Sequence, residues 1–127
     1  MCYTEEGSET FRVQFYPSGE GGPVREYLRS LKQTPHRKAA AAKLGLDLRL
    51  LQEEGLMSKQ VSVKRIAGVT GSVWELRRSF EGVKYRIYFC VRRGEIWLLH
   101  YLEKKSPKIP RHDLELIRER AKGVLYR

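Results

Sequence analysis

The residues most suited to chemistry in this chain are cations fixed at the edges of strand-like runs in its second half. Arg77 ends one run, Arg86 lies inside the next, and Lys104 and Lys105 follow the last one. Guanidinium and ammonium groups held on a rigid sheet bind phosphate oxygens and stabilise charge that develops on them. Their spacing therefore predicts a surface for a polyanion, with donors placed for attack on a phosphodiester.

Each of these cations also has a structural interpretation. Arg86 stands among apolar and aromatic residues, where a charge is costly unless it pairs with a carboxylate or meets an anionic ligand. An ion pair with Glu75 on the neighbouring run is one interpretation, and contact with a phosphate is the one we favour. Lys104 and Lys105 could equally be a solvated loop, and Arg77 an ordinary surface cation. On the phosphate interpretation, Arg86→Ala abolishes activity and leaves folding intact.

Composition points to nucleic acid as the partner. Lys and Arg total 25 against 15 Asp and Glu, and from residue 73 onward the chain holds 14 basic and 7 acidic residues. Nucleic acid is the leading partner for such a surface. The alternative is a soluble protein that is basic without binding nucleic acid. Neither Cys2 nor Cys90 has a disulfide framework or metal-ligand spacing around it. We see no signal peptide, membrane span, metal motif or cofactor motif, and we expect a cytoplasmic protein without cofactor.

Hydrophobic periodicity predicts one α+β domain over residues 1–127, with 1–10 as an irregular tail. Proline at 23 and Thr34–Pro35 are typical of helix starts, and Gly55 of a helix end. The stretch 55–72 has no clear period and is predicted to be a mobile basic loop. The expected order is β-α-α-β-β-β-α, mainly antiparallel, with a helical hairpin on one sheet face and a C-terminal helix. The predicted elements are a strand at 10–16, helices from 23 and from 35, strands at 73–79, 83–91 and 95–102, and a helix from 110.

The pairing register decides which charges share a face of the sheet. If the apolar residues of the last three strands face one core, Arg77 and Arg86 lie on the opposite face. A two-residue turn at Arg93–Gly94 extends this alternation into the last strand. It places Leu98, His100 and Leu102 on the core face. The second face is then expected to carry Arg77, Lys84, Arg86, Tyr88 and Tyr101.

An ordered set of short motifs resembles a known group of proteins. From Phe11 to Gly123 the chain resembles the HigB-type branch of the RelE/ParE toxin superfamily, often described as phage-derived or host-killing proteins. The motifs that carry the resemblance are Trp74-Glu75-Leu76-Arg77, Tyr85-Arg86, Leu98-Leu99-His100 and Lys104-Lys105 with Lys108 and Pro110.

The resemblance implies a small RelE-like fold and a function. Such proteins are toxins of type II toxin–antitoxin systems: metal-independent, ribosome-dependent endoribonucleases that cut messenger RNA. It also implies a cognate HigA-like antitoxin with a DNA-binding domain, a toxin–antitoxin hetero-oligomer, and the ribosome with its messenger RNA as partners. By match of motif, the catalytic residues are Arg86, Lys104, Lys105 and Arg77. The expected RNA-binding residues are Lys64, Lys84, Tyr88, Tyr101, Lys108 and His112.

Two other functions fit the sequence less well. A ParE-like member of the same superfamily inhibits DNA gyrase and has no nuclease activity, whereas a plain nucleic-acid-binding module uses the basic face for affinity alone. The sequence departs from the RelE pattern at Glu75, and it leaves the proton-transfer group open between Tyr126, His112 and a lysine whose pKa is lowered by neighbouring cations.

Overall fold

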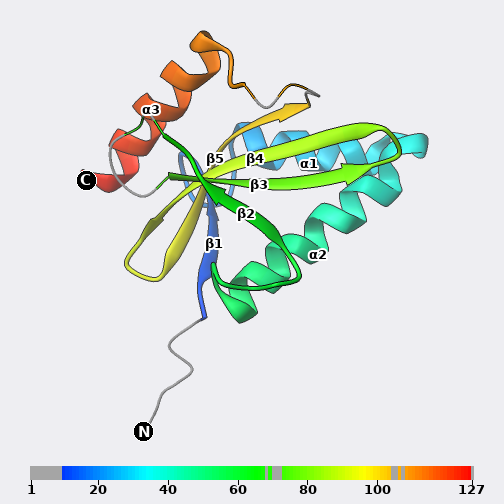
Figure 1. The fold of residues 1–127 in the computed structure, drawn as a ribbon, viewed down its shortest axis with the longest axis horizontal. Helices are drawn as coiled ribbons and strands as arrows, with labels where there is room; N and C mark the ends of the chain where they lie inside the picture. Colours follow the sequence, from blue (N-terminus) through cyan, green and yellow to red (C-terminus); the bar gives the residue numbers. More distant parts are fainter. Residues whose placement is uncertain (1–9, 68, 70–72, 104–105, 107, 127) are drawn as a thin grey trace, which may run out of the picture.

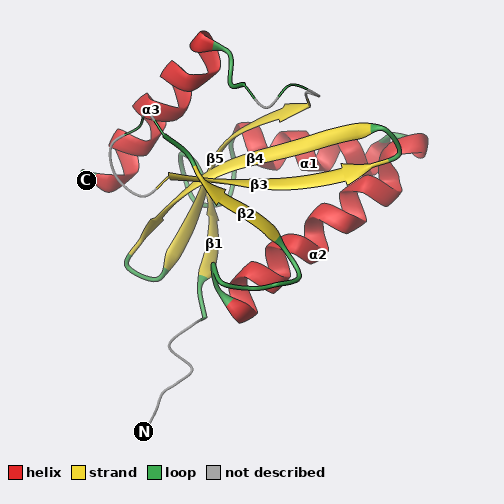
Figure 2. Cartoon of the chain, in the orientation of Figure 1, coloured by secondary structure: helices red, strands yellow, loops and turns green. Residues whose placement is uncertain are grey.

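The computed structural model describes residues 10–67, 69, 73–103, 106 and 108–126 (Figure 1). A five-stranded sheet, in the order β1-β5-β4-β3-β2, lies between a helical hairpin and a C-terminal helix (Figure 2). Strand β1 runs parallel to β5, and the other neighbours are antiparallel. The elements are β1 (Arg12–Phe15), α1 (Pro23–Gln33), the single-turn helix η1 (Pro35–Arg37), α2 (Lys38–Glu54), β2 (Ser62–Arg65), β3 (Val73–Phe80), β4 (Val83–Arg92), β5 (Glu95–Glu103) and α3 (Arg111–Leu125).

The predicted α+β class, the helical hairpin and the C-terminal helix are confirmed, but the sheet has one more strand than predicted. Strand β2 lies in the stretch that the sequence presented as a mobile loop, and it pairs with β3. Val61 and Val63 face the helical hairpin while Ser62 alternates with them. This period of two is visible in the sequence, but four residues are too few to stand out beside the surrounding glycines.

The starts and ends of the two hairpin helices follow their local sequence, with one correction. Pro23 occupies the first turn of α1, and Gly55 ends α2 with a positive φ of 80°. Gly22 allows the chain to enter α1, because a Cβ there would lie 1.7 Å from the backbone oxygen of Tyr16. Thr34 does not cap α2 as expected. Its hydroxyl donates instead to the backbone oxygen of Ser30 in α1, and η1 intervenes before α2 begins.

Two tight turns set the register of the antiparallel strands. Glu81–Gly82 and Arg93–Gly94 both have positive φ at each central residue, as type I′ hairpin turns require. The predicted two-residue turn at Arg93–Gly94 is confirmed, since Arg92 and Glu95 are directly paired across it.

A β-bulge in β5 changes the faces predicted for the end of that strand. The β4–β5 register shifts between Tyr88 and Phe89: Phe89 pairs with Leu98, but Tyr88 pairs with His100. The extra residue is Leu99, and beyond it every side chain of β5 exchanges faces. The expected positions of His100, Tyr101 and Leu102 are therefore wrong.

The consequences of the bulge are visible in the contacts of those residues. Tyr101 lies on the hairpin side, where its ring stacks on Tyr27 of α1 with 3.9 Å between centroids. Leu102, instead of Tyr101, lies on the same face as Arg86 and directly opposite it. His100 lies on the α3 side of the sheet.

Two apolar clusters hold the layers together, one on each face of the sheet. The hairpin cluster joins α1 and α2 to residues such as Leu76, Ile87 and Phe89, while the α3 cluster joins Ile117 and Val124 to the other face. Cys90 belongs to the second cluster, and burial raises the pKa of its thiol to about 12, as expected for an unreactive buried cysteine.

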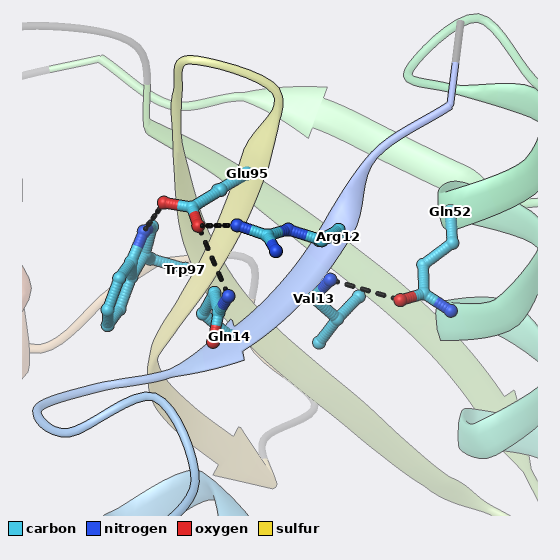
Figure 3. A network of polar contacts seen from close by, with 6 residues as sticks. All are labelled: Arg12, Val13, Gln14, Gln52, Glu95 and Trp97. Carbon is cyan, nitrogen blue, oxygen red and sulfur yellow. Dashed lines mark hydrogen bonds and ion pairs between the residues drawn. The ribbon is translucent and has the colours of Figure 1, made fainter.

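Strand β1 is anchored by a polar network around Glu95 (Figure 3). The Glu95 carboxylate accepts hydrogen bonds from Trp97 Nε1 at 3.1 Å, Arg12 at 2.8 Å and Gln14 at 3.2 Å. These donors, the indole most strongly, lower the pKa of Glu95 below its ordinary value. On the other side of the strand, Gln52 of α2 accepts from the backbone N–H of Val13 at 3.0 Å.

Helix α3 is tied to the bulge through His100. Arg120 donates to His100 Nδ1 at 3.1 Å and to the Leu99 backbone oxygen at 2.7 Å, and His100 Nε2 lies 2.8 Å from Asp113. Because a guanidinium can only donate, Nδ1 accepts, and the imidazole carries its proton on Nε2, directed at Asp113. Burial, with help from the charges of Arg120 and His112 and against the effect of Asp113, lowers the pKa of His100.

This lowered pKa predicts acid-sensitive docking of α3. As pH falls below about 6.5, the unfolded chain takes up a proton on His100 that the folded chain resists, so stability falls until the lowered folded pKa is passed. We expect the melting temperature to drop less between pH 7.5 and 5.5 in His100→Gln than in the parent protein. His36→Gln, at an exposed histidine, is the control. Equal pH dependence in the parent and His100→Gln would contradict the assignment.

Candidate nucleic-acid interface

The candidate site lies on the α3 face of the sheet, where mostly polar residues of four strands form two rows. Residues directly opposite each other in paired strands share a face. One row runs across Ser62, Arg77 and Arg86 to Leu102. The next runs across Lys64, Glu75 and Tyr88 to His100. The predicted grouping of Arg77, Lys84, Arg86 and Tyr88 on one face is therefore present, without Tyr101.

Glu75 is the centre of this arrangement. Its carboxylate accepts a hydrogen bond from the Tyr88 hydroxyl at 2.7 Å and from Arg86 at 3.3 Å, both on Oε2. Its other oxygen, Oε1, lies 3.3 Å from Arg77 Nε. One buried carboxylate thus joins two guanidiniums and a phenol across β3 and β4.

The two arginines differ sharply in their access to solvent. The Arg86 side chain is 1% exposed, whereas that of Arg77 is 37% exposed. The sequence left open an ion pair between Arg86 and Glu75, and the structure contains that pair. In this conformation Arg77 can contact a phosphate from solvent, whereas Arg86, its partner on the next strand, is covered.

Tyr88 is also covered. It is fully buried, and burial together with its hydrogen bond to Glu75 raises the pKa of its hydroxyl above the ordinary value. A phenol in this position holds the carboxylate in place. Its ring is not available to stack on a base.

Two hollows flank the Glu75–Arg77 pair. The larger, of about 400 Å³, is lined by Glu75 together with Lys64, Arg65 and Lys108, and by apolar residues from the segments around Ile66 and Ile109. The second, of about 310 Å³, is lined by Gln60, Ser62, Arg77, Arg78, Ser79 and Lys84. Cations from β2, β3, β4 and the segment before α3 therefore line the two hollows.

The remaining predicted residues take different positions. Lys64, Lys84 and Lys108 are partly or fully exposed beside the hollows. His112 is exposed in the first turn of α3. Tyr101 lies on the other face, and the predictions for Lys104 and Lys105 concern residues outside those described.

The contribution of β2 to this face was not predicted from the sequence. Arg65, Ser62 and Gln60 line the hollows, and none of them was predicted as a site residue. The signal that could have found two of them is the alternation that identifies β2 as a strand. Within the described residues, no three His, Cys, Asp or Glu side chains lie together as a metal site would need.

The comparison with protein families gives this face its context. The family described as Phage derived protein Gp49-like (DUF891) matches residues 26–122, well over half of the chain. The chain belongs to the Gp49-like family. This family is part of the RelE/HigB-like toxin group and is associated with toxins of toxin–antitoxin systems. No curated protein and no solved structure matches the chain significantly.

The RelE-like order of elements agrees with this membership, and the family's match begins inside α1 and ends within α3. It therefore covers the hairpin, strands β2 to β5 and all residues of the Glu75 cluster. No helix in the described part of the chain is both long and apolar enough to span a membrane.

The burial of Arg86 in its pair with Glu75 predicts that Arg86→Ala lowers stability, as the ion-pair interpretation of the sequence implies and the phosphate interpretation does not. Arg86→Ala removes one partner of a buried pair and leaves the Glu75 carboxylate with less compensation, a change that typically costs about 3–5 kcal/mol. We expect a loss near the lower end of that range, because Arg77 and Tyr88 still contact the carboxylate. Urea denaturation with linear extrapolation measures it.

Arg77→Ala is the matched control for that experiment. Its side chain is far more exposed, so its ion pair with the same carboxylate is expected to contribute at most about 1 kcal/mol. An Arg86→Ala protein as stable as Arg77→Ala would show that Arg86 is not held as the structure places it.

Proposed function

We propose that this Gp49-like protein is a HigB-type toxin that acts in the cytoplasm as a ribosome-dependent endoribonuclease and cuts messenger RNA. The observation that carries the proposal is the accessible Arg77, held by a buried carboxylate on a face bordered by lysines. Family membership supports the toxin class, and the geometry supports a phosphate ligand.

The arrangement can serve phosphodiester cleavage by the neighbouring 2′-hydroxyl. That reaction needs donors for the charge growing on the phosphate oxygens, and fixed cations often supply the largest part of the rate enhancement. Arg77 is the donor that a phosphate can reach. Lys64, Lys84 and Lys108 lie beside the hollows on either side of it, where the RNA backbone would run. The bond between phosphorus and the 5′-oxygen breaks as the bond from the 2′-oxygen forms. A base takes the proton of the 2′-hydroxyl and an acid gives one to the leaving 5′-oxygen, so the products are a cyclic phosphate and a 5′-hydroxyl.

Arg86 takes a positioning role in this proposal. It is the second cation on the Glu75 carboxylate, so it holds that group in place, and the carboxylate in turn orients Arg77. The proposed contribution of Lys104 and Lys105 rests on the motif resemblance. The natural partners are the ribosome with its messenger RNA, and a HigA-like antitoxin with a DNA-binding domain whose acidic groups complement this basic protein.

Arg77→Ala is therefore expected to lower the rate of messenger RNA cleavage about 100- to 1,000-fold, the usual cost of losing a transition-state donor. The rate is measured on ribosomes programmed with a reporter messenger RNA, and in cells by mapping transcript 5′ ends after brief induction. Arg49→Ala, an exposed arginine of α2 on the other side of the sheet, should cut at the parental rate.

Three outcomes would contradict the proposal. The first is parental cleavage by a folded Arg77→Ala protein, which would remove Arg77 from the site. The second is normal growth of cells that contain soluble, folded parent protein. The third is trapped DNA cleavage by gyrase without new transcript ends, which would assign the protein to the ParE-like class.

A further inference from the structure

The larger of the two hollows lies between the β2 side of the sheet and the start of α3. Its sheet side is formed by residues 64–67 and Glu75, and its other side by Lys108, Ile109 and Leu114. Helix α3 itself packs mainly on β4 and β5. The width of the hollow therefore depends on how the start of α3 is fixed relative to the sheet.

The start of α3 has little apolar support. The buried residues of the helix are Ile117, Ala121 and Val124, so they lie from its second turn onward. No side-chain hydrogen bond caps the helix at its first residue, and Ile109, just before it, is only partly buried. Helix ends of this kind fray unless another contact holds them.

Asp113 supplies such a contact in the first turn of α3. Its carboxylate accepts a hydrogen bond from His100 Nε2 at 2.8 Å. His100 is 8% exposed, and Arg120 holds it in place by donating to its Nδ1 and to the backbone oxygen of Leu99. A hydrogen bond to a carboxylate is shorter and stronger than one between neutral groups. The first turn of α3 is therefore tied to the bulge of β5.

His100 also belongs to the second row of the candidate site. It lies directly opposite Tyr88, with 6.4 Å between the ring centroids, and the Tyr88 hydroxyl donates to Glu75. The row that begins at Lys64 thus ends at the residue that holds α3. The hydrogen bond from His100 to Asp113 connects the sheet side of the hollow to its α3 side.

We propose that His100 and Asp113 are positioning residues of the RNA site. Their hydrogen bond fixes the start of α3 and so holds Lys108, Ile109 and Leu114 across the hollow from the sheet. RNA then binds between two walls that are already ordered, and the cost of ordering one of them on binding is avoided. The inference rests on the proposed function only in taking RNA as the ligand.

The position of the two residues predicts which step they affect. Asp113 and His100 lie on the α3 side of the larger hollow, whereas Arg77 lines the other hollow. Losing their hydrogen bond should therefore weaken RNA binding and leave the chemical step at the phosphate unchanged. In kinetic terms, KM rises and kcat stays the same.

The test measures RNA affinity and cleavage separately. The affinity probe is a fluorescein-labelled, 2′-O-methylated RNA of about ten nucleotides, which has no free 2′-hydroxyl and is not cut. Fluorescence anisotropy measures its binding to the full chain. We expect Asp113→Ala to bind at least about tenfold more weakly than the parent protein, a loss of about 1.4 kcal/mol. On programmed ribosomes the same variant should raise KM by a similar factor and leave kcat within about twofold.

Two further variants separate the hydrogen bond from the charge of Asp113. Asp113→Asn keeps an oxygen that accepts from His100 Nε2–H and should restore most of the affinity. Glu115→Ala removes an exposed carboxylate of the same helix, which pairs with Arg111, and should bind RNA at least as well as the parent. Asp113→Ala and Glu115→Ala raise the net charge equally, so charge alone cannot distinguish them.

Two measurements show whether the variants act through the fold. The Asp113 side chain is 21% exposed and lies outside the α3 cluster, so Asp113→Ala should fold. Amide hydrogen exchange at residues 111–114 should be faster in Asp113→Ala than in Asp113→Asn. His100→Leu combined with Asp113→Ala should lose no more affinity than the weaker single variant, because both remove the same hydrogen bond.

The proposal is overturned by any of four results. The first is a parent protein that does not bind the RNA. The second is equal affinity of Asp113→Ala and Glu115→Ala, and the third is an Asp113→Asn protein that binds as weakly as Asp113→Ala. The fourth is a lower kcat at unchanged KM, which would place Asp113 in the chemistry. A protein whose RNA affinity follows the expected order but which cuts no messenger RNA would refute only the proposed function.

Discussion

A single buried carboxylate allows this sheet to carry arginines on adjacent strands. Arg77 and Arg86 are direct partners across β3 and β4, where like charges repel and destabilise the pairing. Glu75 lies two residues before Arg77 and contacts both guanidiniums. The desolvation of the carboxylate is offset by those two contacts and by the hydrogen bond from Tyr88, so the buried carboxylate and the like-charged pair stabilise one another. The cationic face depends on this cluster. A surface lysine in place of Arg77 would lack the fixed orientation that the carboxylate gives the guanidinium.

The elements with strong periodicity were predicted from the sequence. The change of faces in β5, which depends on the single extra residue of the bulge, was not. Proline, glycine and the spacing of apolar residues indicate the helices in the sequence. The pairs Glu81–Gly82 and Arg93–Gly94 indicate the type I′ turns. The bulge at Leu99 has no comparable signal, because Leu98, Leu99 and His100 can face either core. It is recognised only once α3 is in place, where Arg120 contacts both the Leu99 backbone and His100.

The candidate site was predictable in part for the same reason. Alternation predicted that four residues of β3 and β4 share one face: Arg77, Lys84, Arg86 and Tyr88. The bulge lies in β5 and does not change these positions, so all four are on that face. Alternation does not predict how far each side chain is exposed to solvent. Both arginines occupy equivalent positions in the pattern, yet only Arg77 reaches solvent, because Arg86 lies in the central strand with Leu102 across from it. Burial depends on neighbours from other elements, such as Leu102 of β5, which a single strand's pattern does not contain.

The bulge at Leu99 connects the two sides of the larger hollow. Without the extra residue His100 would point toward the helical hairpin, and its hydrogen bond to Asp113 could not form. With it, the row that holds Glu75 and Tyr88 ends in a side chain that reaches α3. Two polar contacts in one row therefore place the cations of the sheet and those before α3: Tyr88 with Glu75, and His100 with Asp113. Such contacts are directional, whereas apolar packing alone would not fix the first turn of α3, because its buried residues lie further along the helix. The one feature of the sheet that has no signal in the sequence thus positions one side of the proposed RNA site.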